Sequence, residues 1–420
     1  MSPTAAEQAA DRFRALRHRN FRLYWFGQLV SLVGTWMQSV AQGWLMHRLT
    51  HSAFMLGLLT FTQFVPVLMF SLWAGVIADR VDKRRLLLIT QTALFLQALT
   101  IAIVVTTGVV TPGMVIGLAF LYGTFNAFDL PARQSFLVEL VGKEDLSNGI
   151  ALNSAAFNTA RIIGPAIAGI LVASIGEAGC FWINAVSFIA VLIGLAMIRL
   201  APRATQNRGA ADLMDGVRYA LATRPLRNLL LLLGIAAGLG FQYMVLLPVY
   251  AREILASGAE AYGLLVSAFG LGSLISAAVM TRRLDRMQLR RNLLIGLTTA
   301  GIGMGTFAWS RVLPLSLAAG FLAGFGLILY VASTNTMLQQ TTEDRYRGRI
   351  MGLYTLMFVG TAPFGAILCG TIAQHFGAPW ATTLSALVLL GGAVWVWHRI
   401  RVLAIREVEP PVPPQVEKVG

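Results

Sequence analysis

The sequence predicts an all-α integral membrane protein with twelve transmembrane helices in two pseudo-symmetric six-helix bundles. Hydrophobic residues make up 56% of the 420 residues and charged residues only 12%, about half the charged share of a soluble domain. Apolar runs of about 20 residues, enough to cross a hydrocarbon core about 30 Å thick as a helix, recur along the chain. A repeated loop sequence divides these runs into two sets of six.

The apolar runs follow one another with short polar breaks. We place the twelve spans at residues 22–46, 54–77, 86–107, 113–132, 150–175, 180–198, 228–250, 261–280, 292–310, 314–337, 350–374 and 380–398. The first run is too long for a cleaved signal peptide and has no small-residue cleavage site behind it. We therefore expect an uncleaved first helix.

The distribution of the basic residues predicts the topology. With the N-terminus inside, 29 of the 33 Lys and Arg residues fall in cytoplasmic segments and only Arg48, Arg252 and Arg311 in external loops. This asymmetry follows the positive-inside rule and places both termini in the cytoplasm of a bacterial inner membrane. The net charge of +14 is thus a topology signal, and we expect no nucleic-acid partner. The remaining basic residue is Arg161.

Five segments follow from these patterns. They are a basic N-terminal segment (1–20), an N-terminal bundle (21–199), a linker (200–226), a C-terminal bundle (227–400) and a Pro-rich tail (401–420). Residues 1–20 suit either a basic helix on the anionic membrane surface or a solvated tail. The linker contains a candidate amphipathic helix around Leu213, Val217 and Leu221.

An internal repeat supports the two halves. The loop ADRVDKRRLLLI (Ala78 to Ile89) follows the second span, and LDRMQLRRNLLI (Leu284 to Ile295) follows the eighth, with seven of twelve positions identical. Because both copies lie on the same side, the halves are related by an axis along the membrane normal. Spans five and eleven also share Gly and Pro residues, which predict tight packing or bending where the halves meet.

The first span carries a polar stripe on one helical face. Uncharged polar groups facing lipid without partners cost several kcal/mol each, so the stripe must face protein or water. With the mid-span ring of Trp36, it suits a cavity for a bulky amphipathic ligand; the alternative is hydrogen bonding between packed helices. The stripe consists of Gln28, Ser31, Thr35, Gln38, Ser39 and Gln42.

The stretch GVIADRVDKRR (Gly75 to Arg85) resembles the loop motif GxxxDRxGR(K/R) of the major facilitator superfamily, with Asp82 in place of the second Gly. The stretches FDLPARQSFLVELV, NGIALNSAAFNTARIIGPAIAG and RYRGRIMGLY are similar to its drug and siderophore exporters. The resemblance implies the major facilitator fold, alternating access and a cytoplasmic gate between the halves. The gate residues it implies are Gly75, Asp79, Arg80, Arg84 and Arg85, with Asp285 and Arg286 from the repeat.

In that superfamily, spans one, four, seven and ten line the central cavity. The resemblance therefore adds polar residues of the last three spans to the stripe of the first, although each could equally be a packing hydrogen bond. The candidates are Tyr122, Asn126, Gln242, Tyr243, Tyr330 and Asn335.

Arg161 is a cation near the middle of the fifth span. A charge at this depth costs roughly 3 kcal/mol on insertion scales, so the side chain should face the bundle interior, with Asn158 on nearly the same face. It could bind an anionic or polar substrate, tune a proton site, cap helix carbonyls or pair with Asp129. Asp129 itself is the best candidate for proton coupling, and an ion pair with Arg133 is the alternative.

Motifs of other classes are missing from the sequence. There is no Walker motif, no GxSxG elbow and no HExxH, so we expect no enzyme, no metal site and no cofactor, with a proton gradient as the energy source. The two histidines of HRLTH (His47 to His51) lie in a predicted external turn and are interpreted as incidental. Cys180 and Cys369 are interpreted as inert thiols.

The sequence therefore predicts a monomeric secondary transporter that exports a small amphipathic molecule, drug-like or a siderophore, in exchange for protons. Two alternatives stay open, a lysophospholipid or other lipid translocator and a transport-inactive scaffold or sensor with the same fold; an uptake permease is a third.

Overall fold

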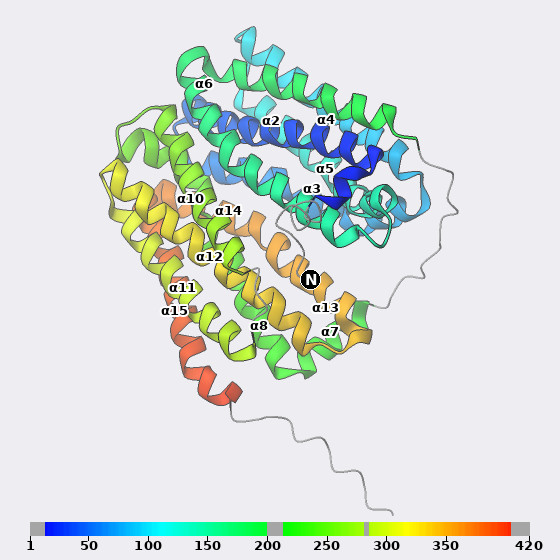
Figure 1. Ribbon diagram of the computed structural model, residues 1–420. Helices are drawn as coiled ribbons and strands as arrows, with labels where there is room; N and C mark the ends of the chain where they lie inside the picture. The colour runs from blue at the N-terminus through cyan, green and yellow to red at the C-terminus, as the bar shows by residue number, and fades with distance from the viewer. Residues whose placement is uncertain (1–12, 200–212, 281–284, 405–420) are drawn as a thin grey trace, which may run out of the picture.

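The computed structural model of this protein describes residues 13–199, 213–280 and 285–404 (Figure 1). In this part of the chain the regular structure is helical throughout. The first group of helices comprises α2 (Arg19–Thr50), α3 (Ala53–Arg80), α4 (Lys83–Thr106), α5 (Pro112–Val141) and α6 (Leu146–Met197), preceded by the short η1 (Arg14–Arg17). The second comprises α8 (Arg224–Ile235), η2 (Ala236–Gly240), α9 (Tyr243–Val249), η3 (Tyr250–Ile254), α10 (Ala259–Val279), α11 (Arg286–Trp309), α12 (Leu313–Thr341), α13 (Asp344–Gly360), α14 (Ala362–Phe376) and α15 (Ala378–Ala404).

Short polar residues begin several of these helices. Ser52 caps α3 and Thr111 caps α5 through side-chain oxygens that accept backbone N–H groups of the first turn. Asp82, which departs from the superfamily loop motif, accepts from the N–H of Arg85 and caps α4. Asp285 and Gln288 form a capping box at the start of α11. Each of the two repeated loops therefore starts a helix with an acidic cap. The two capping residues lie three positions apart when the loops are aligned.

Glycine and breaks in the helices set where the chain turns. Gly176 has φ 79° and ψ 174°, so the 52 residues of α6 form two helices that meet there, as the predicted spans 150–175 and 180–198 require. The predicted span 228–250 is interrupted between η2 and α9, and the span 350–374 is interrupted at Thr361. The break between η2 and α9 was not predicted, whereas the break at Thr361 lies in span eleven, where Gly and Pro residues predicted tight packing or bending.

Nine stretches of the described chain are long and apolar enough to cross a membrane. The 52 residues of α6 count once among them, and α2 and α11 are absent from the nine. Both are long enough to span, at 32 and 24 residues, but the polar stripe of α2 and the charged start of α11 lower their hydropathy. The number twelve therefore stays a prediction.

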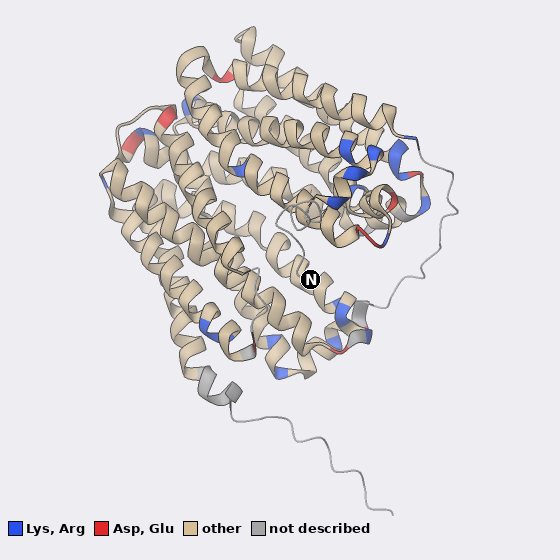
Figure 2. Ribbon diagram, viewed as in Figure 1, with Lys and Arg blue, Asp and Glu red and all other residues tan. Residues whose placement is uncertain are grey.

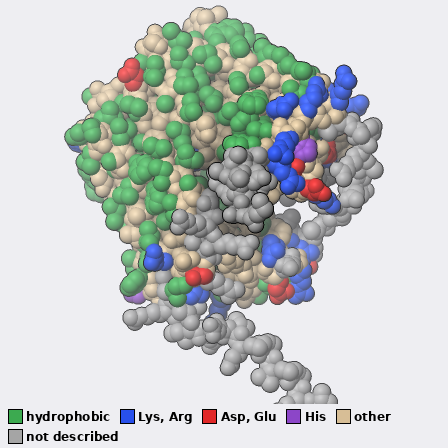
Figure 3. All heavy atoms as spheres, viewed as in Figure 1, with side chains coloured by type: hydrophobic (Ala, Val, Ile, Leu, Met, Phe, Trp, Pro, Cys, Tyr) green, Lys and Arg blue, Asp and Glu red, His purple; other side chains and the backbone are tan. Residues whose placement is uncertain are grey.

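The charged side chains distinguish the two ends of the helices. Lys and Arg gather where α2 and α8 begin and where the α3–α4 and α5–α6 turns lie, and we call this the basic end (Figure 2). The opposite end, with the α2–α3 and α14–α15 turns and Gly176, is the far end. Figure 3 shows hydrophobic side chains over most of the visible face between them. The protein is thus a multi-pass membrane protein with an apolar belt.

The two groups of helices are two bundles that meet through two pairs of helices. Helix α6 packs on α10, and α3 packs on α14, while the remaining close contacts lie mainly within each bundle. In Figure 1 the bundles approach each other at the far end and diverge toward the end where α7 (Leu213–Ala222) and α13 lie.

The predicted linker and the terminal segments are only partly described. Residues 200–212 and 405–420 lie outside the described chain, as do residues 1–12. The predicted amphipathic helix of the linker is confirmed as α7, and Tyr219 stacks on Tyr346 of α13 with ring centroids 4.1 Å apart. The described part of the N-terminal segment packs on α6: the backbone N–H of Ala15 donates to Asn148 Oδ1 at 2.9 Å.

Candidate functional site

Arg161 lies midway along the first arm of α6, where α6 packs against α10. Its Nη2 donates to Asn158 Oδ1 at 3.1 Å, and its Nε is buried without a hydrogen-bond partner. Tyr243, from α9 of the other bundle, is within electrostatic range of the guanidinium. In the described chain no carboxylate forms an ion pair with Arg161, and Asp129, the partner considered from the sequence, pairs with Arg133 instead. Arg161 therefore keeps an unused donor at mid-depth.

Two aromatic pairs lie on helices that pack around this part of α6. Trp36 of α2 meets Phe157 of α6 edge to face, with centroids 5.8 Å apart and ring planes at 68°. Tyr243 stacks on Phe269 of α10 at 4.0 Å and 9°. Gly164 allows the close approach of α2 and α6 at the first pair, because a methyl group there would lie 2.7 Å from Trp36 Cβ. The site thus combines one cation with flat apolar rings from both bundles.

The polar side chains of the α2 stripe differ in their hydrogen bonding: Gln38 is bonded to other helices, whereas the amide nitrogen of Gln42 has no partner. Gln38 Nε2 donates to Gln97 Oε1 at 3.2 Å, and Gln38 Oε1 accepts from Asn184 Nδ2 at 2.7 Å, so this side chain ties α2 to α4 and α6. This is the helix-packing alternative, and Gln38 is removed from the candidate cavity. Gln28 and Ser31 are also buried, each 3% exposed, and Thr35 donates to the Ser31 carbonyl. Gln42 is 5% exposed, and its amide nitrogen has no partner.

The candidates from the other three spans are not brought together. Tyr330 is fully buried in the core of the second bundle, and Gln242 donates to the carbonyl of Ala237 in its own segment. Tyr122 packs on the cluster of Leu94, Ala98, Ala185 and Phe188 inside the first bundle. Asn335 accepts from Gln339, and Asn126 is half-buried. Of these six, Tyr243 is the residue within electrostatic range of Arg161.

Asp129 is enclosed within the first bundle. Its side chain is fully buried and is held by both Nε and Nη2 of Arg133, by Thr90 Oγ1 at 2.8 Å and by Gln91 Nε2 at 2.8 Å. The ion pair considered as the alternative is therefore present within α5, and Thr90 and Gln91 join it from α4. Every hydrogen-bond partner of this carboxylate is a donor.

Comparison with known proteins assigns the chain to a family. Residues 10–415 match the family model of the transmembrane secretion effectors. The chain belongs to this family of the major facilitator superfamily. Solved structures agree on the fold: a bacterial homologue of the human lysosomal transporter Spinster (TM-score 0.71, 14% identity, covering 94% of this chain and 98% of that one) and the nucleoside transporter NupG (TM-score 0.70, 13% identity, 92% and 99%).

Similar sequences lie among characterised transporters. The staphyloferrin A transporter of Staphylococcus aureus is 26% identical, over 85% of this chain and 90% of that protein. The multidrug efflux pump Tap of Mycolicibacterium fortuitum is 27% identical, over 90% and 95%. The enterobactin exporter EntS of Shigella boydii is 28% identical, over 84% and 85%.

The superfamily loop motif has a structural role within one bundle. Arg84 donates from Nε to the carbonyl of Leu195 and from Nη2 to that of Ala196, both at 2.7 Å, and so binds the free carbonyls where α6 ends. Arg80 and Arg85 are exposed, and a methyl group on Gly75 would meet nothing within 4 Å.

The latch between the halves stays a prediction. Asp285 is occupied in its capping box, and the side chains of Asp79 and Arg286 lie outside the described part of the structure. Among the gate side chains that the structure does describe, none bonds to the opposite bundle in this conformation.

Sequence reasoning on this transmembrane secretion effector missed Phe157 and Phe269. An aromatic residue in an apolar helix carries no signal by itself. Phe157 is four positions before Arg161, so helical periodicity could have placed both on one face. The position of Phe269 follows only from its stacking on Tyr243, which depends on how α9 and α10 pack.

Proposed function

We propose that this protein is a secondary active transporter of the inner membrane that exports a small amphipathic molecule, of the siderophore or drug class, by alternating access in exchange for protons. The observation that carries the proposal is the Arg161 guanidinium, which has an unused buried donor beside Tyr243 and the Trp36–Phe157 pair. A buried donor without a partner is costly, so a ligand that supplies an oxygen is favoured there. The roles of the similar proteins, two concerned with siderophores and one with multidrug efflux, support the same class of transported molecule.

The arrangement of the bundles supports loading from the basic end, which we assign to the cytoplasm by the positive-inside rule. The hydrogen bonds that join the bundles in the described chain lie at the far end and at mid-depth. At the far end Ser52 Oγ and the Phe54 N–H donate to Gln374 Oε1, at 2.8 and 3.4 Å, and at mid-depth Ser267 donates to the Ile162 carbonyl at 2.9 Å. Release to the outside then requires these contacts to open and the basic end to close.

For proton coupling we retain Asp129 and Arg161. A proton moving inward across about 100 mV supplies roughly 2.3 kcal/mol. Protonation of Asp129 would weaken the hydrogen bonds that it accepts from Thr90 and Gln91 of α4, and so would loosen the contact between α4 and α5. The change would then reach the arm of α6 that carries Arg161 through α2, because Gln97 of α4 bonds to Gln38 and Trp36 packs on Phe157.

The test is a proteoliposome assay with an imposed proton gradient and a panel of dyes, macrolides, catecholate siderophores and lysophospholipids. We expect gradient-dependent flux of a dye, macrolide or siderophore, reduced at least about tenfold in Arg161→Ala, a loss of about 1.4 kcal/mol or more of binding. Arg161→Lys keeps the charge and should retain part of it. Arg311→Ala, at an exposed position, is the matched control. If no compound moves, or if Arg161→Ala transports as the control does, the proposal is wrong.

One observation favours lipid translocation as a second candidate. A cavity of about 490 Å³ lies between α2 and the two arms of α6, lined by apolar side chains such as Val33, Ile167 and Val186. Val186 is 62% exposed and Ile167 38% exposed at its edge, so this cavity opens on the apolar belt. Flux of lysophospholipid without flux of the soluble compounds would favour this candidate.

A further inference from the structure

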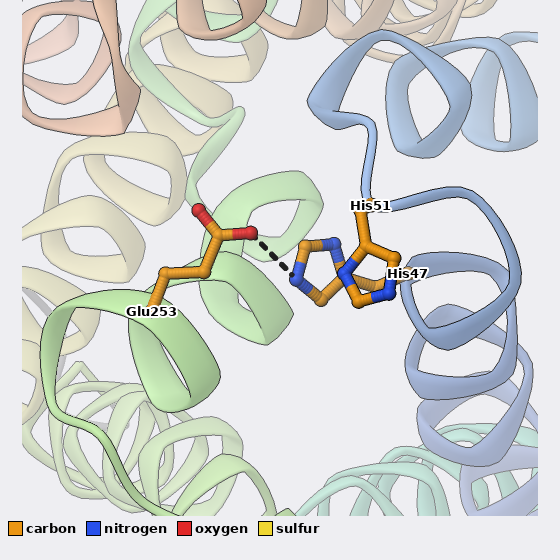
Figure 4. A group of neighbouring side chains, drawn as sticks. All are labelled: His47, His51 and Glu253. Atoms are coloured by element: carbon orange, nitrogen blue, oxygen red, sulfur yellow. Dashed lines mark ion pairs between the residues drawn. The ribbon is translucent and has the colours of Figure 1, made fainter.

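Three metal-binding side chains from both bundles meet at the far end. His47 and His51 belong to the end of α2, and Glu253 belongs to η3 of the second bundle (Figure 4). One ligand atom from each lies within 4.8 Å of the other two. His47 Nε2 is 3.1 Å from Glu253 Oε1, and the two imidazole centroids are 5.9 Å apart. The sequence showed the two histidines but not the carboxylate, which is about 200 residues away.

His47 is the group that needs a partner. It is 1% exposed, and neither ring nitrogen makes a hydrogen bond in the described chain, although Nε2 approaches the Glu253 carboxylate. Buried polar atoms are nearly always satisfied, and leaving one unsatisfied costs about 1–3 kcal/mol. His47 therefore has an ion-pair contact with Glu253 at Nε2 and an unsatisfied Nδ1, and a buried imidazole directed at a carboxylate suits a cation held between the two side chains.

The backbone at the end of α2 brings the second imidazole into place. His51 has φ 47° and ψ 34°, the left-handed conformation that closes a helix, and its N–H donates to the His47 carbonyl at 2.8 Å. This turn places the His51 ring beside the His47 ring (Figure 4), with one ligand atom of each within 4.8 Å of the Glu253 carboxylate.

The neighbouring arginines are engaged elsewhere. Arg252 lies over the ring of Trp44, 5.9 Å from its centroid, and Arg48 pairs with Glu177 at 2.7 Å. Neither arginine forms an ion pair with Glu253, and the Glu253 side chain, which is 50% exposed, can move.

We propose that His47, His51 and Glu253 form a site for a divalent transition-metal ion of the zinc class, which joins the two bundles at the far end. Two imidazole nitrogens and one carboxylate oxygen are a common protein ligand set for Zn²⁺, with water at the fourth position, whereas Ca²⁺ and Mg²⁺ prefer oxygen ligands alone. Zinc bonds of about 2.0–2.1 Å put the ligands of a tetrahedral site roughly 3.3 Å apart. The exposed His51 and Glu253 side chains can close the remaining distance by rotamer changes.

Binding at this site holds the far end closed, because its ligands come from both bundles. Zinc binding itself is independent of the proposed function. Inhibition of transport by zinc rests on the proposed function, because export requires the far end to open.

Metal binding is tested on the purified full-length protein, prepared with an affinity tag that lacks histidine. Titration calorimetry with ZnCl₂ should show one site that CaCl₂ and MgCl₂ do not fill. Glu253→Gln and His51→Asn, which suits the left-handed position, should each weaken zinc binding at least about tenfold, since even outer-shell changes cost about 10- to 100-fold. His375→Gln, an exposed histidine of α14 at the same end, is the matched control. Absence of zinc binding, or wild-type affinity in Glu253→Gln, would overturn the site.

Bridging is tested by spin labels at Val109→Cys and Val312→Cys, exposed positions on different bundles at the far end. In the protein with an intact site, zinc should narrow the distribution of distances between the two labels to its short component. In the Glu253→Gln variant, zinc should leave this distribution unchanged. Bound zinc with an unchanged distribution would contradict the bridge. Bound zinc that narrows the distribution without inhibiting flux would count against the proposed transport cycle and leave the site intact.

Discussion

Gly169 of α6 and Gly263 of α10 lie against each other where the bundles join. A methyl group on Gly263 would come within 2.9 Å of Gly169 Cα and 2.5 Å of the Pro165 carbonyl oxygen. A second pair repeats the arrangement: a methyl group on Gly370 of α14 would lie 3.0 Å from Gly57 Cα of α3. The expectation that small residues of spans five and eleven pack tightly where the halves meet is confirmed.

Substitution of Gly263 by alanine should therefore weaken the closed far end. Overpacking costs about 1–3 kcal/mol, which is roughly a 5- to 150-fold shift in a conformational equilibrium. We expect the spin-label distance between positions 109 and 312 to lengthen in Gly263→Ala. Gly117→Ala, where an added methyl meets nothing within 4 Å, should leave the distance unchanged; equal behaviour of the two variants would refute the role of the contact.

Asp129→Asn should destabilise the protein, because it leaves the Arg133 guanidinium, 18% exposed, without its anion. Breaking one side of a buried ion pair costs about 3–5 kcal/mol, which thermal unfolding in detergent would register. The double variant Asp129→Asn with Arg133→Gln should recover most of this stability. It should not recover gradient-driven export, and wild-type export by the double variant would rule out Asp129 as the coupling group.

Arg84→Ala should loosen the end of α6, since both bonded carbonyls, Leu195 and Ala196, lose a charged donor. Hydrogen bonds to charged groups contribute about 1.5–3 kcal/mol, so we expect a loss of that order in the free energy of unfolding. Arg85→Ala is the control, because that side chain is exposed. If the two variants unfold alike, Arg84 does not hold α6.

Asp145 should make attachment of the N-terminal segment pH-dependent. The His18 imidazole at 2.7 Å and the Arg14 guanidinium at 2.5 Å hold the pKa of this carboxyl below its ordinary value of 3.8. A carboxyl with a lowered pKa contributes stability above its ordinary pKa and loses it as the pH falls through the lowered value. Asp145→Asn should thus be less stable than the wild type at pH 7, and thermal unfolding should show the difference closing below about pH 4. A difference that does not change with pH would contradict this account.

Much of the fold could be predicted because each membrane-spanning helix requires a run of about 20 apolar residues, which is visible along the sequence. Hydropathy placed the helices, including the two arms of α6 on either side of Gly176, and the repeated loops indicated two halves. The break at Phe241–Gln242 was not predicted from hydropathy, whereas the break at Thr361 lies between Gly360 and Pro363 of span eleven, where bending was one of the two expectations.

The candidate site was less predictable. Helical periodicity places a side chain on a face but does not say what the face packs against. Gln38 and Gln242 had the polar character of cavity residues, yet their amides bond to neighbours inside one bundle.

The sequence by itself determined the membrane location, the helical repeat, the asymmetry of basic charge and the oddity of Arg161, because each is a matter of composition or of spacing along one helix. Only the tertiary structure decided which polar residues meet. It separated Asp129 from Arg161, brought Tyr243 to Arg161 and placed Glu253 beside His47. These outcomes depend on contacts between helices far apart in the chain, which are set by close approach at residues such as Gly169 and Gly263 and carry no local signal.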